Sequence, residues 1–389
     1  MRLPGELSPN ATTRTLNALR SSGVDIIDLT VSNPTKVGLH YPSDLLHPLS
    51  SADALSYDPN PLGLMSAREA VAQDFARRGI SVSPERIALT ASTSEAYSWL
   101  FKLLCDPDDV VLVPRPSYPL FEHLTVLESV VARPYRLEYH GTWRIDPDHF
   151  ESAVDGRTRA VLVVSPNNPT GSFVHADDLR ALDELCSARN LMLIGDEVFA
   201  DFPLDAPTQS ASVLSARASV VCSLGGLSKT VGLPQAKLGW IAFGGPAPRI
   251  EELLPAYELI ADTYLSVSTP VQVAAAHLLD HGAQVRRQIQ ERTRRNLLRL
   301  RESVGRTPAV SLLLVEGGWS AVLQVPSFRS EESLVLELLT SDHVLVHPGY
   351  FFDFERETFL VVSLLPEAEQ FDRGIDRVLA RASRPGTLS

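Results

Sequence analysis

The sequence predicts an α/β fold built around a mostly parallel sheet, and two observations support this prediction. From about residue 86 to residue 245, short apolar runs alternate with amphipathic segments of helical period. Several of the runs are apolar on consecutive residues, which is typical of strands buried on both faces. Such an alternation indicates strand–helix–strand units, whose strands are usually parallel.

Six apolar runs are predicted as strands, with helices between them. Residues 175–190 (HADDLRALDELCSARN) show the helix signals most clearly, with apolar side chains at one helical spacing and acidic residues in the first turn. Asn190 is expected to end this helix in a left-handed conformation. The predicted strands lie in RIALTAS (86–92), DVVLVPR (109–115), RAVLVVSPN (159–167), NLMLIGDE (190–197), SVVCSLG (219–225) and KLGWIAFGG (237–245).

The chain has 389 residues, so two or three domains are expected at roughly 100–200 residues each. The proline-rich first 60 residues resemble an arm and a loop region. A long charged helix is predicted from about 284 to 304, and the apolar segments after it indicate a smaller α+β domain. We therefore predict an N-terminal arm with part of the small domain (1–45), a large α/β domain (46–283) and a small C-terminal domain (284–389).

Composition and charge exclude several classes of protein. The net charge of −12 argues against a general nucleic-acid binder, and the basic segment 286–301 lacks interleaved aromatic residues. The three cysteines have no CxxC spacing, so they are expected to be reduced and to bind no metal. No apolar run is long enough to span a membrane, and no signal peptide is evident. A cytoplasmic location is expected.

Polar residues follow directly after several of the predicted strands. They are Ser92–Ser94, Asn167 with Asn168, Asp196 and Lys229. In open α/β sheets, ligands bind at the carboxyl ends of the strands. These residues are therefore the candidates for a binding site.

Each candidate also has an ordinary structural interpretation. Ser92 and Glu95 fit a capping box, which predicts a helix from about Thr93 that either is simply capped or binds an anion such as phosphate. Asp196 needs a cation or a protonated ring nitrogen if buried, or it caps the following turn. Lys229 either forms a Schiff base at a lowered pKa or extends its amine to solvent. No metal-binding spacing surrounds these residues, and neither GxGxxG nor a P-loop motif is present.

Four segments together carry a resemblance that covers nearly the whole chain, from about residue 28 to residue 368. They are RPSYPLF (115–121), SPNNPTG (165–171), GDEVF (195–199) and LSKTVGLPQAKLGW (227–240). The sequence resembles the class I/II aminotransferases, which are pyridoxal phosphate (PLP)-dependent enzymes of fold type I. The resemblance implies that fold, with a large PLP-binding domain, PLP as the cofactor and a homodimer with shared active sites.

The resemblance also implies a role for each candidate residue. Lys229 would form the Schiff base with PLP and then transfer protons as general base and acid. Asp196 would pair with the pyridine nitrogen, and Tyr118 would stack on the ring as a further catalytic residue. Asn168 would bind the ring hydroxyl oxygen; Ser92, Thr93, Ser94 and Lys237 would hold the phosphate, together with Tyr57 from the partner subunit.

Four positions depart from the family pattern. Phe199 replaces a tyrosine that contacts the ring hydroxyl oxygen, Gly226 replaces a serine, and Lys237 replaces an arginine. Val361 stands where the family has the arginine that binds the substrate α-carboxylate with two hydrogen bonds. Either another cation substitutes, with Arg356, Lys36 and Arg115 as candidates, or the substrate has no carboxylate there. Asn33, Lys36, Trp319, His347 and Arg356 are the candidates for the substrate side.

The resulting hypothesis is an aminotransferase that moves an amino group from an amino acid or related amine to a 2-oxo acid or another carbonyl acceptor. A decarboxylase, lyase or condensing enzyme on the same fold is the first alternative, because the missing arginine changes how a substrate is oriented. A regulatory PLP-binding protein is the second alternative. No helix-turn-helix segment precedes the domain, and this argues against it.

Overall fold

The computed structural model describes residues 8–205, 210–356 and 358–384. Within these residues, an eight-stranded sheet has the order β2-β9-β8-β7-β6-β3-β4-β5. All six apolar runs form strands of this sheet, so that prediction is confirmed. The strands are β2 (Ile87–Thr90), β3 (Val110–Arg115), β4 (Val131–Tyr139), β5 (Trp143–Ile145), β6 (Thr158–Val164), β7 (Met192–Asp196), β8 (Val221–Gly226) and β9 (Gly239–Gly244).

The central strands β8, β7, β6, β3 and β4 are parallel to one another. β9 runs antiparallel to both β2 and β8, and β5 runs antiparallel to β4. The sheet is therefore mostly parallel, as expected. β4 and β5 are not among the predicted strands, because this end of the sheet is largely half-buried and carries charged and polar residues in place of a continuous apolar run.

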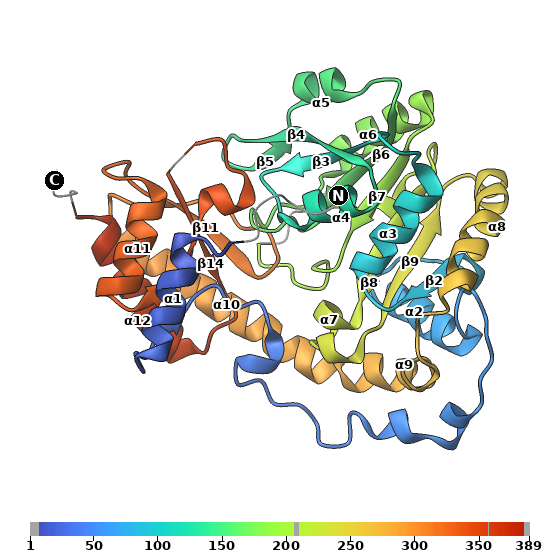
Figure 1. The fold of residues 1–389 in the computed structure, drawn as a ribbon, viewed down its shortest axis with the longest axis horizontal. Coiled ribbons are helices and arrows are strands. Elements are labelled where there is room, and N and C mark those ends of the chain that lie inside the picture. Colours follow the sequence, from blue (N-terminus) through green and yellow to red (C-terminus); the bar gives the residue numbers. More distant parts are fainter. Residues whose placement is uncertain (1–7, 206–209, 357, 385–389) are drawn as a thin grey trace.

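Helices cover both faces of the sheet (Figure 1). Alternate residues of each strand belong to different clusters: Val110 and Leu112 of β3 join one core, and Val111 and Val113 join the other. The first core includes α2, α5, α6 and α9, and the second includes α3, α4 and α8. The helices are α2 (Met65–Arg77), α3 (Thr93–Leu104), α4 (Leu120–Leu127), α5 (Pro147–Ala153), α6 (Ala176–Arg189), α7 (Leu227–Thr230), α8 (Ala247–Tyr264) and α9 (Thr269–His281).

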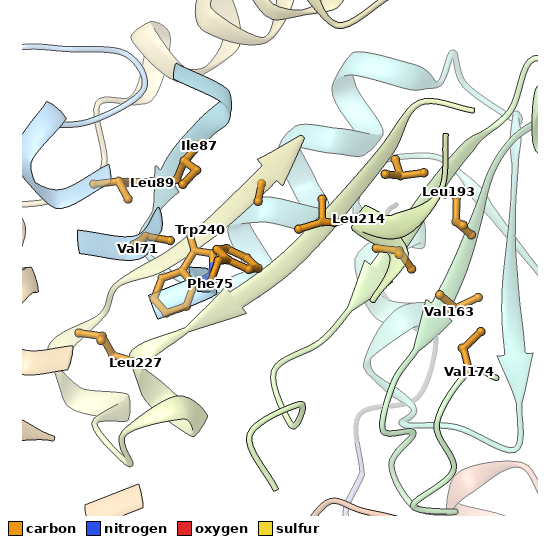
Figure 2. Packing of buried hydrophobic residues seen from close by; sticks show 14 of the residues in the cluster. Val71, Phe75, Ile87, Leu89, Val163, Val174, Leu193, Leu214, Leu227 and Trp240 are labelled. Carbon is orange, nitrogen blue, oxygen red and sulfur yellow. The ribbon is translucent and has the colours of Figure 1, made fainter. Parts of the chain in front are cut away.

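Figure 2 shows part of the first core, in which Trp240 of β9 and Phe75 of α2 are the largest labelled side chains. Leu227, the first residue of α7, is buried in the same cluster. The short helix α7 carries Lys229, so its position is fixed by the apolar residue at its start. Burying one leucine side chain contributes roughly 1.5–3 kcal/mol to this placement.

A second part of the molecule contains the C-terminal elements and the N-terminal helix. A four-stranded sheet has the order β10-β11-β14-β13, and β1 pairs with β12 in parallel. Figure 1 shows α1 at the left of the view, where it packs against α11. These elements are α1 (Ala11–Ser21), β1 (Ile27–Asp28), α10 (Ala283–Gly305), β10 (Ser311–Leu312), β11 (Ser320–Gln324), α11 (Glu331–Ser341), β12 (Val344–Leu345), β13 (His347–Pro348), β14 (Phe359–Ser363) and α12 (Ala368–Ala382).

The long charged helix is confirmed as α10, which begins at Ala283. The pairing of β1 with β12 joins residues near the N-terminus to the C-terminal part, which agrees with an arm that contributes to the small domain. The division of the chain into domains at residues 45 and 283 stays a proposal. Residues 1–7, 206–209, 357 and 385–389 of these domains lie outside the described residues. In the described ranges, no helix combines the length and the hydropathy needed to cross a bilayer.

Candidate active site at the carboxyl ends of the strands

The candidate residues lie around one end of the large sheet, where several strands finish. β7 ends at Asp196, β6 leads into Asn167 and Asn168, and β8 leads into the helix that carries Lys229. The central strands are parallel, so their carboxyl ends lie on one edge of the sheet. This is the edge at which open α/β sheets bind ligands.

Helix α3 begins at Thr93, as the capping-box pattern predicts. The Ser92 hydroxyl oxygen accepts the Glu95 N–H at 3.2 Å, and a Glu95 carboxylate oxygen accepts the Ala91 N–H at 2.6 Å. In a capping box the glutamate carboxylate accepts the N–H of the cap residue itself, whereas here it accepts the N–H of Ala91, the residue before the cap. The backbone N–H groups of Thr93 and Ser94 donate to no group among the described residues. They leave an anion site at the positive end of the helix dipole.

Two glycines allow the backbone to approach this helix end closely. A Cβ atom on Gly239 would lie 3.0 Å from the Ser92 carbonyl carbon and 3.2 Å from the Thr93 nitrogen. A Cβ atom on Gly226 would lie 3.1 Å from the Leu238 carbonyl oxygen, so a serine at this position would crowd the backbone. Glycine at position 226 therefore allows the end of β8 and the start of β9 to lie in close contact.

Lys237 is exposed and adopts a left-handed backbone conformation, with φ of 53°. It lies two residues before Gly239, where the chain passes the start of α3. The Leu227 N–H donates to the Leu238 carbonyl oxygen at 2.9 Å, which fixes the turn after Lys237 against α7. The charge of Lys237 is thus carried by the loop that borders the anion site.

Asp196 is buried at the end of β7. One carboxylate oxygen accepts the hydroxyl of Tyr97 at 2.7 Å, and the other accepts the Val198 N–H at 3.2 Å. Burial raises the pKa of this carboxyl, while these two hydrogen bonds and the charge of Lys229 act in the opposite direction. Within the described part of the chain, no cation forms an ion pair with Asp196 at 4.0 Å or less. The carboxylate therefore suits a cationic ligand atom.

Lys229 lies in α7, and its amine faces two aromatic side chains that pack against each other. Its Nζ atom is 4.9 Å from the ring centre of Trp319 and 5.5 Å from that of Phe199. It donates a long hydrogen bond of 3.4 Å to the carbonyl oxygen of Ser32. Burial lowers the pKa of Lys229 to about 8, although Asp196 acts to raise it. At pH 7 about a tenth of the amine is therefore unprotonated and nucleophilic, and the fraction is about half at pH 8.

The two asparagines of SPNNPTG have different environments. The Asn167 amide bonds with Ser117, with the Pro116 carbonyl oxygen and with Thr170, so its side chain is occupied in holding the loop. The Asn168 side chain accepts only a hydrogen bond of 3.3 Å from Ser320 among the described residues. Asn168 is therefore the amide with capacity left for a ligand.

Tyr118 and Tyr57 are both exposed. Tyr118, 43% exposed, lies in the loop between β3 and α4. This loop is tied to the second part of the molecule by the Ser117 N–H, which donates to the Phe352 carbonyl oxygen at 3.0 Å. Tyr57 is 69% exposed and lines a small hollow with Trp99 and Leu265. Neither tyrosine contacts Lys229 in any interaction found for the described residues.

Val361 is buried in an apolar cluster with Trp143, Leu313, Phe352 and Phe354. It lies in β14 opposite His347 of β13. Position 361, where the family has a carboxylate-binding arginine, is therefore closely surrounded by apolar groups.

The proposed substitutes for that arginine lie at or near the surface. Arg356 and Lys36 are exposed, and the Arg115 guanidinium is 3.5 Å from a carboxylate oxygen of Asp353. The Asn33 side chain accepts hydrogen bonds from the backbone and hydroxyl of Thr35, so it caps a short helix. Among the described residues, the Lys229 amine contacts Ser32, Phe199 and Trp319 and none of these groups, and their substrate roles stay predictions.

The sequence was compared with protein families and with known proteins. The family model for aminotransferase class I and II matches residues 28–378. The chain belongs to this family. Class I and II aminotransferases are enzymes that use PLP, and residues 28–378 include every candidate residue named above.

Individual relatives of this aminotransferase are distant. Glutamate-pyruvate aminotransferase AlaA of Escherichia coli K12 is 25% identical over 368 residues, which cover 92% of this chain and 91% of the relative. An Escherichia coli aminotransferase of known structure has a TM-score of 0.87 at 24% identity, over 99% of this chain and 100% of the other. An Arabidopsis thaliana S-alkyl-thiohydroximate lyase is 31% identical over 241 residues, or 60% of this chain and 51% of the lyase. The structural likeness confirms the predicted fold type.

The aminotransferase site has one wall that is aromatic. Trp319 is buried, and its indole N–H has no hydrogen-bond partner among the described residues. His347 stacks on Phe351, with ring centres 4.7 Å apart, and burial lowers the pKa of His347 to about 4. His347 is therefore neutral near pH 7 and does not replace the missing arginine as a cation.

Two contacts of this site were not found from the sequence. Tyr97 bonds to Asp196 across the sheet, although the two residues are 99 positions apart. Glu197, next to Asp196, accepts hydrogen bonds from Ser212 and Ser223 and from the Val213 backbone, so it holds a loop. The only signal for Tyr97 was its place on the apolar face of α3, where a buried hydroxyl needs a partner.

Proposed function

We propose that this aminotransferase binds PLP covalently through Lys229 and transfers an amino group from an amino acid or related amine to a 2-oxo acid or similar carbonyl acceptor. One observation carries the proposal: a lysine with a pKa of about 8 lies near a buried carboxylate that has no cation within ion-pair distance in the described residues. A ligand with an aldehyde and a protonated ring nitrogen complements both groups.

The residues of the site fit the parts of PLP. The free N–H groups of Thr93 and Ser94 suit the phosphate, and the nearby loop carries the positive charge of Lys237. Gly239 leaves out a side chain that would crowd this anion site, and Gly226 leaves out one that would crowd the start of β9. Ser92 caps the helix, Asn168 suits the ring hydroxyl oxygen, and the exposed ring of Tyr118 is the candidate to stack on the cofactor.

PLP, when bound, stabilises negative charge on the carbon atom next to the amino nitrogen of the substrate. Lys229 would act first as a general base that removes a proton from that carbon atom. It would act later as a general acid that donates a proton. Asp196 would stay ionised and hold the ring nitrogen protonated. Phe199 and Trp319 pack beside the lysine amine and limit its contact with water, and this burial lowers the pKa of Lys229.

The substrate side favours donors that do not depend on an arginine at position 361. Val361 is surrounded by apolar side chains, and His347 is uncharged near pH 7. The indole N–H of Trp319 is a buried donor close to the reactive amine, so it is the best-placed group for a substrate oxygen. Asn33, Lys36 and Arg356 remain weaker candidates.

A cytoplasmic homodimer is also part of the proposal. Leu55 and Tyr57 are 89% and 69% exposed, and the hollow that Tyr57 lines also includes Leu265. Apolar side chains gathered in this way are typical of a surface that another subunit covers. The three cysteines are free, which is usual in a reducing compartment.

Reductive trapping tests the proposal. Borohydride treatment of the protein incubated with PLP should attach the cofactor to Lys229, as located by peptide mass spectrometry. Lys237→Ala should still be labelled, whereas Lys229→Ala should not be labelled and should have no turnover. A label on Lys237 in the unmodified protein would refute the assignment.

A lyase is the second candidate, because a plant S-alkyl-thiohydroximate lyase is 31% identical over 60% of this chain. A panel of amino donors distinguishes the two reactions. An aminotransferase converts the bound cofactor to its pyridoxamine form and needs a carbonyl acceptor to turn over repeatedly. A lyase releases a fragment of the donor and turns over without an acceptor.

A further inference from the structure

Tyr97 makes a contact for which the proposed function provides no role. It lies in α3, is 1% exposed, and packs between Phe101 and Phe121. Its hydroxyl donates to a carboxylate oxygen of Asp196 at 2.7 Å. The length is that of a strong hydrogen bond between a hydroxyl and a carboxylate.

The groups that face Asp196 divide into two sets. Tyr97, the Val198 N–H and the charge of Lys229 favour the ionised carboxylate, whereas burial and the neighbouring carboxylate of Glu197 oppose it. The Cys222 thiol on β8 also faces Tyr97 and is neutral, because burial raises its pKa. Tyr97 is therefore an uncharged side chain that lies in α3, outside the strand β7 of Asp196, and stabilises the negative charge of Asp196.

The hydrogen bond also fixes the direction of the carboxylate. One oxygen is held by Tyr97 and the other by the Val198 N–H, so the plane of the carboxylate is set from two elements. Tyr97 belongs to the helix whose first turn presents the free N–H groups of Thr93 and Ser94. One rigid helix thus positions both the anion site and the carboxylate.

We propose that Tyr97 is a positioning residue that keeps Asp196 ionised and oriented toward the protonated ring nitrogen of the cofactor. The inference rests on the proposed function, because that function supplies the ring nitrogen. Removing the hydroxyl would leave Asp196 with fewer hydrogen bonds to its charged form. Its pKa would rise further, and a neutral pair of carboxylic acid and pyridine would become more populated.

A double-mutant cycle tests this inference on the full-length protein. The dissociation constant of PLP is measured for the wild type, Tyr97→Phe, Asp196→Asn and the double variant. Tyr97→Phe should weaken PLP binding about tenfold, the size expected for a hydrogen bond to a charged group. In the Asp196→Asn background, the same change should have an effect of about twofold or less.

Thermal unfolding without PLP gives a second, independent readout. The carboxyl of Asp196 has a raised pKa in the folded protein, so its ionisation costs stability as pH rises above the unfolded value. Without the hydroxyl this cost is larger. The deficit in Tm of Tyr97→Phe should therefore grow as the pH rises above the ordinary aspartate value.

Tyr135→Phe is the matched control. Tyr135 is also 1% exposed, but its hydroxyl donates to the Leu162 carbonyl oxygen at 2.9 Å and meets no carboxylate. Its deficit in Tm should not depend on pH, and its PLP affinity should stay that of the wild type. A pH-independent deficit for Tyr97→Phe, or equal losses of affinity in both Asp196 backgrounds, would show a packing role and overturn the inference. A wild type that binds no PLP would overturn the proposed function and the inference together.

Discussion

Lys229 and Lys237 are eight residues apart and have different surroundings. The Lys229 amine is close to two aromatic rings and one carbonyl oxygen, whereas Lys237 is exposed on a turn. Burial lowers the pKa of Lys229, because its ammonium group is separated from water. The contrast agrees with a covalent role for Lys229 and an electrostatic role for Lys237.

The pKa of Lys229 predicts how its capture of PLP depends on pH. Since the neutral amine is the nucleophile, the rate for the cofactor-free protein should rise with pH and level off above about 8. Below that value it should fall about tenfold per pH unit. Stopped-flow absorbance measures the rate, and Lys237→Ala is the control with the same midpoint. A midpoint near 10.5, the ordinary lysine value, would contradict the lowered pKa.

Val361→Arg should destabilise the protein without creating a substrate clamp. The arginine would enter a cluster of Trp143, Leu313 and phenylalanine side chains, which offers no carboxylate among its members. An unpaired buried cation should cost about 3 kcal/mol or more, which thermal unfolding would show as a lower Tm. Val361→Ile is the control of similar shape. Unchanged Tm together with better use of α-amino acids would show that the position faces the substrate after all.

At the scale of elements, the start of β9 packs closely against the start of α3. Gly239→Ala should weaken PLP binding, because the added Cβ atom would lie 3.0 Å from the Ser92 carbonyl carbon and 3.2 Å from the Thr93 nitrogen. The helix end would have to shift, and we expect a loss of affinity of about tenfold at a cost near 1.4 kcal/mol.

Equilibrium titration with PLP measures this effect. Gly305→Ala is the control, because a Cβ atom there meets no atom within 4 Å and Gly305 lies at the end of α10. Equal affinity for Gly239→Ala and the wild type would show that the phosphate does not bind at the start of α3.

The elements differ in how well the sequence predicted them. The central strands were predictable, because strands buried on both faces contain a continuous apolar run, as residues 160–164 of β6 and 192–194 of β7 do. The helix start at Thr93 and the helix end at Asn190 were also predictable, since each depends on local capping. β4 was not, because its pairing is set by a neighbouring strand and its own residues are mixed.

The same distinction applies to the site. Asp196 and Lys229 follow apolar strands directly, so their place at the sheet edge could be inferred from the chain alone. The bond between Tyr97 and Asp196 depends on how α3 packs on β7, and the apolar surroundings of Val361 depend on residues from both parts of the molecule. No local pattern contains that information.

At the scale of the whole molecule, the exposed residues near Tyr57 predict an assembly. Leu55→Glu should shift the protein from dimer to monomer in sedimentation experiments, because Leu55 is 89% exposed beside the proposed contact. PLP affinity should fall as well if the partner's Tyr57 binds the phosphate. Leu298→Glu, at a leucine 58% exposed on α10, is the control and should stay dimeric. A wild type that is monomeric at all concentrations would reject the shared site.

The hydrogen bond from Lys229 to Ser32 links the two parts of the molecule. The Leu29 and Val31 carbonyl oxygens accept hydrogen bonds of 2.7 and 2.6 Å from the backbone and hydroxyl of Ser363 in β14. Ser32, the next residue, meets the amine at 3.4 Å. A rotation of the smaller sheet toward the larger one would carry this carbonyl oxygen with it. The short backbone from Leu29 to Ser32 would thus couple any such rotation to the polarity around the Lys229 nitrogen.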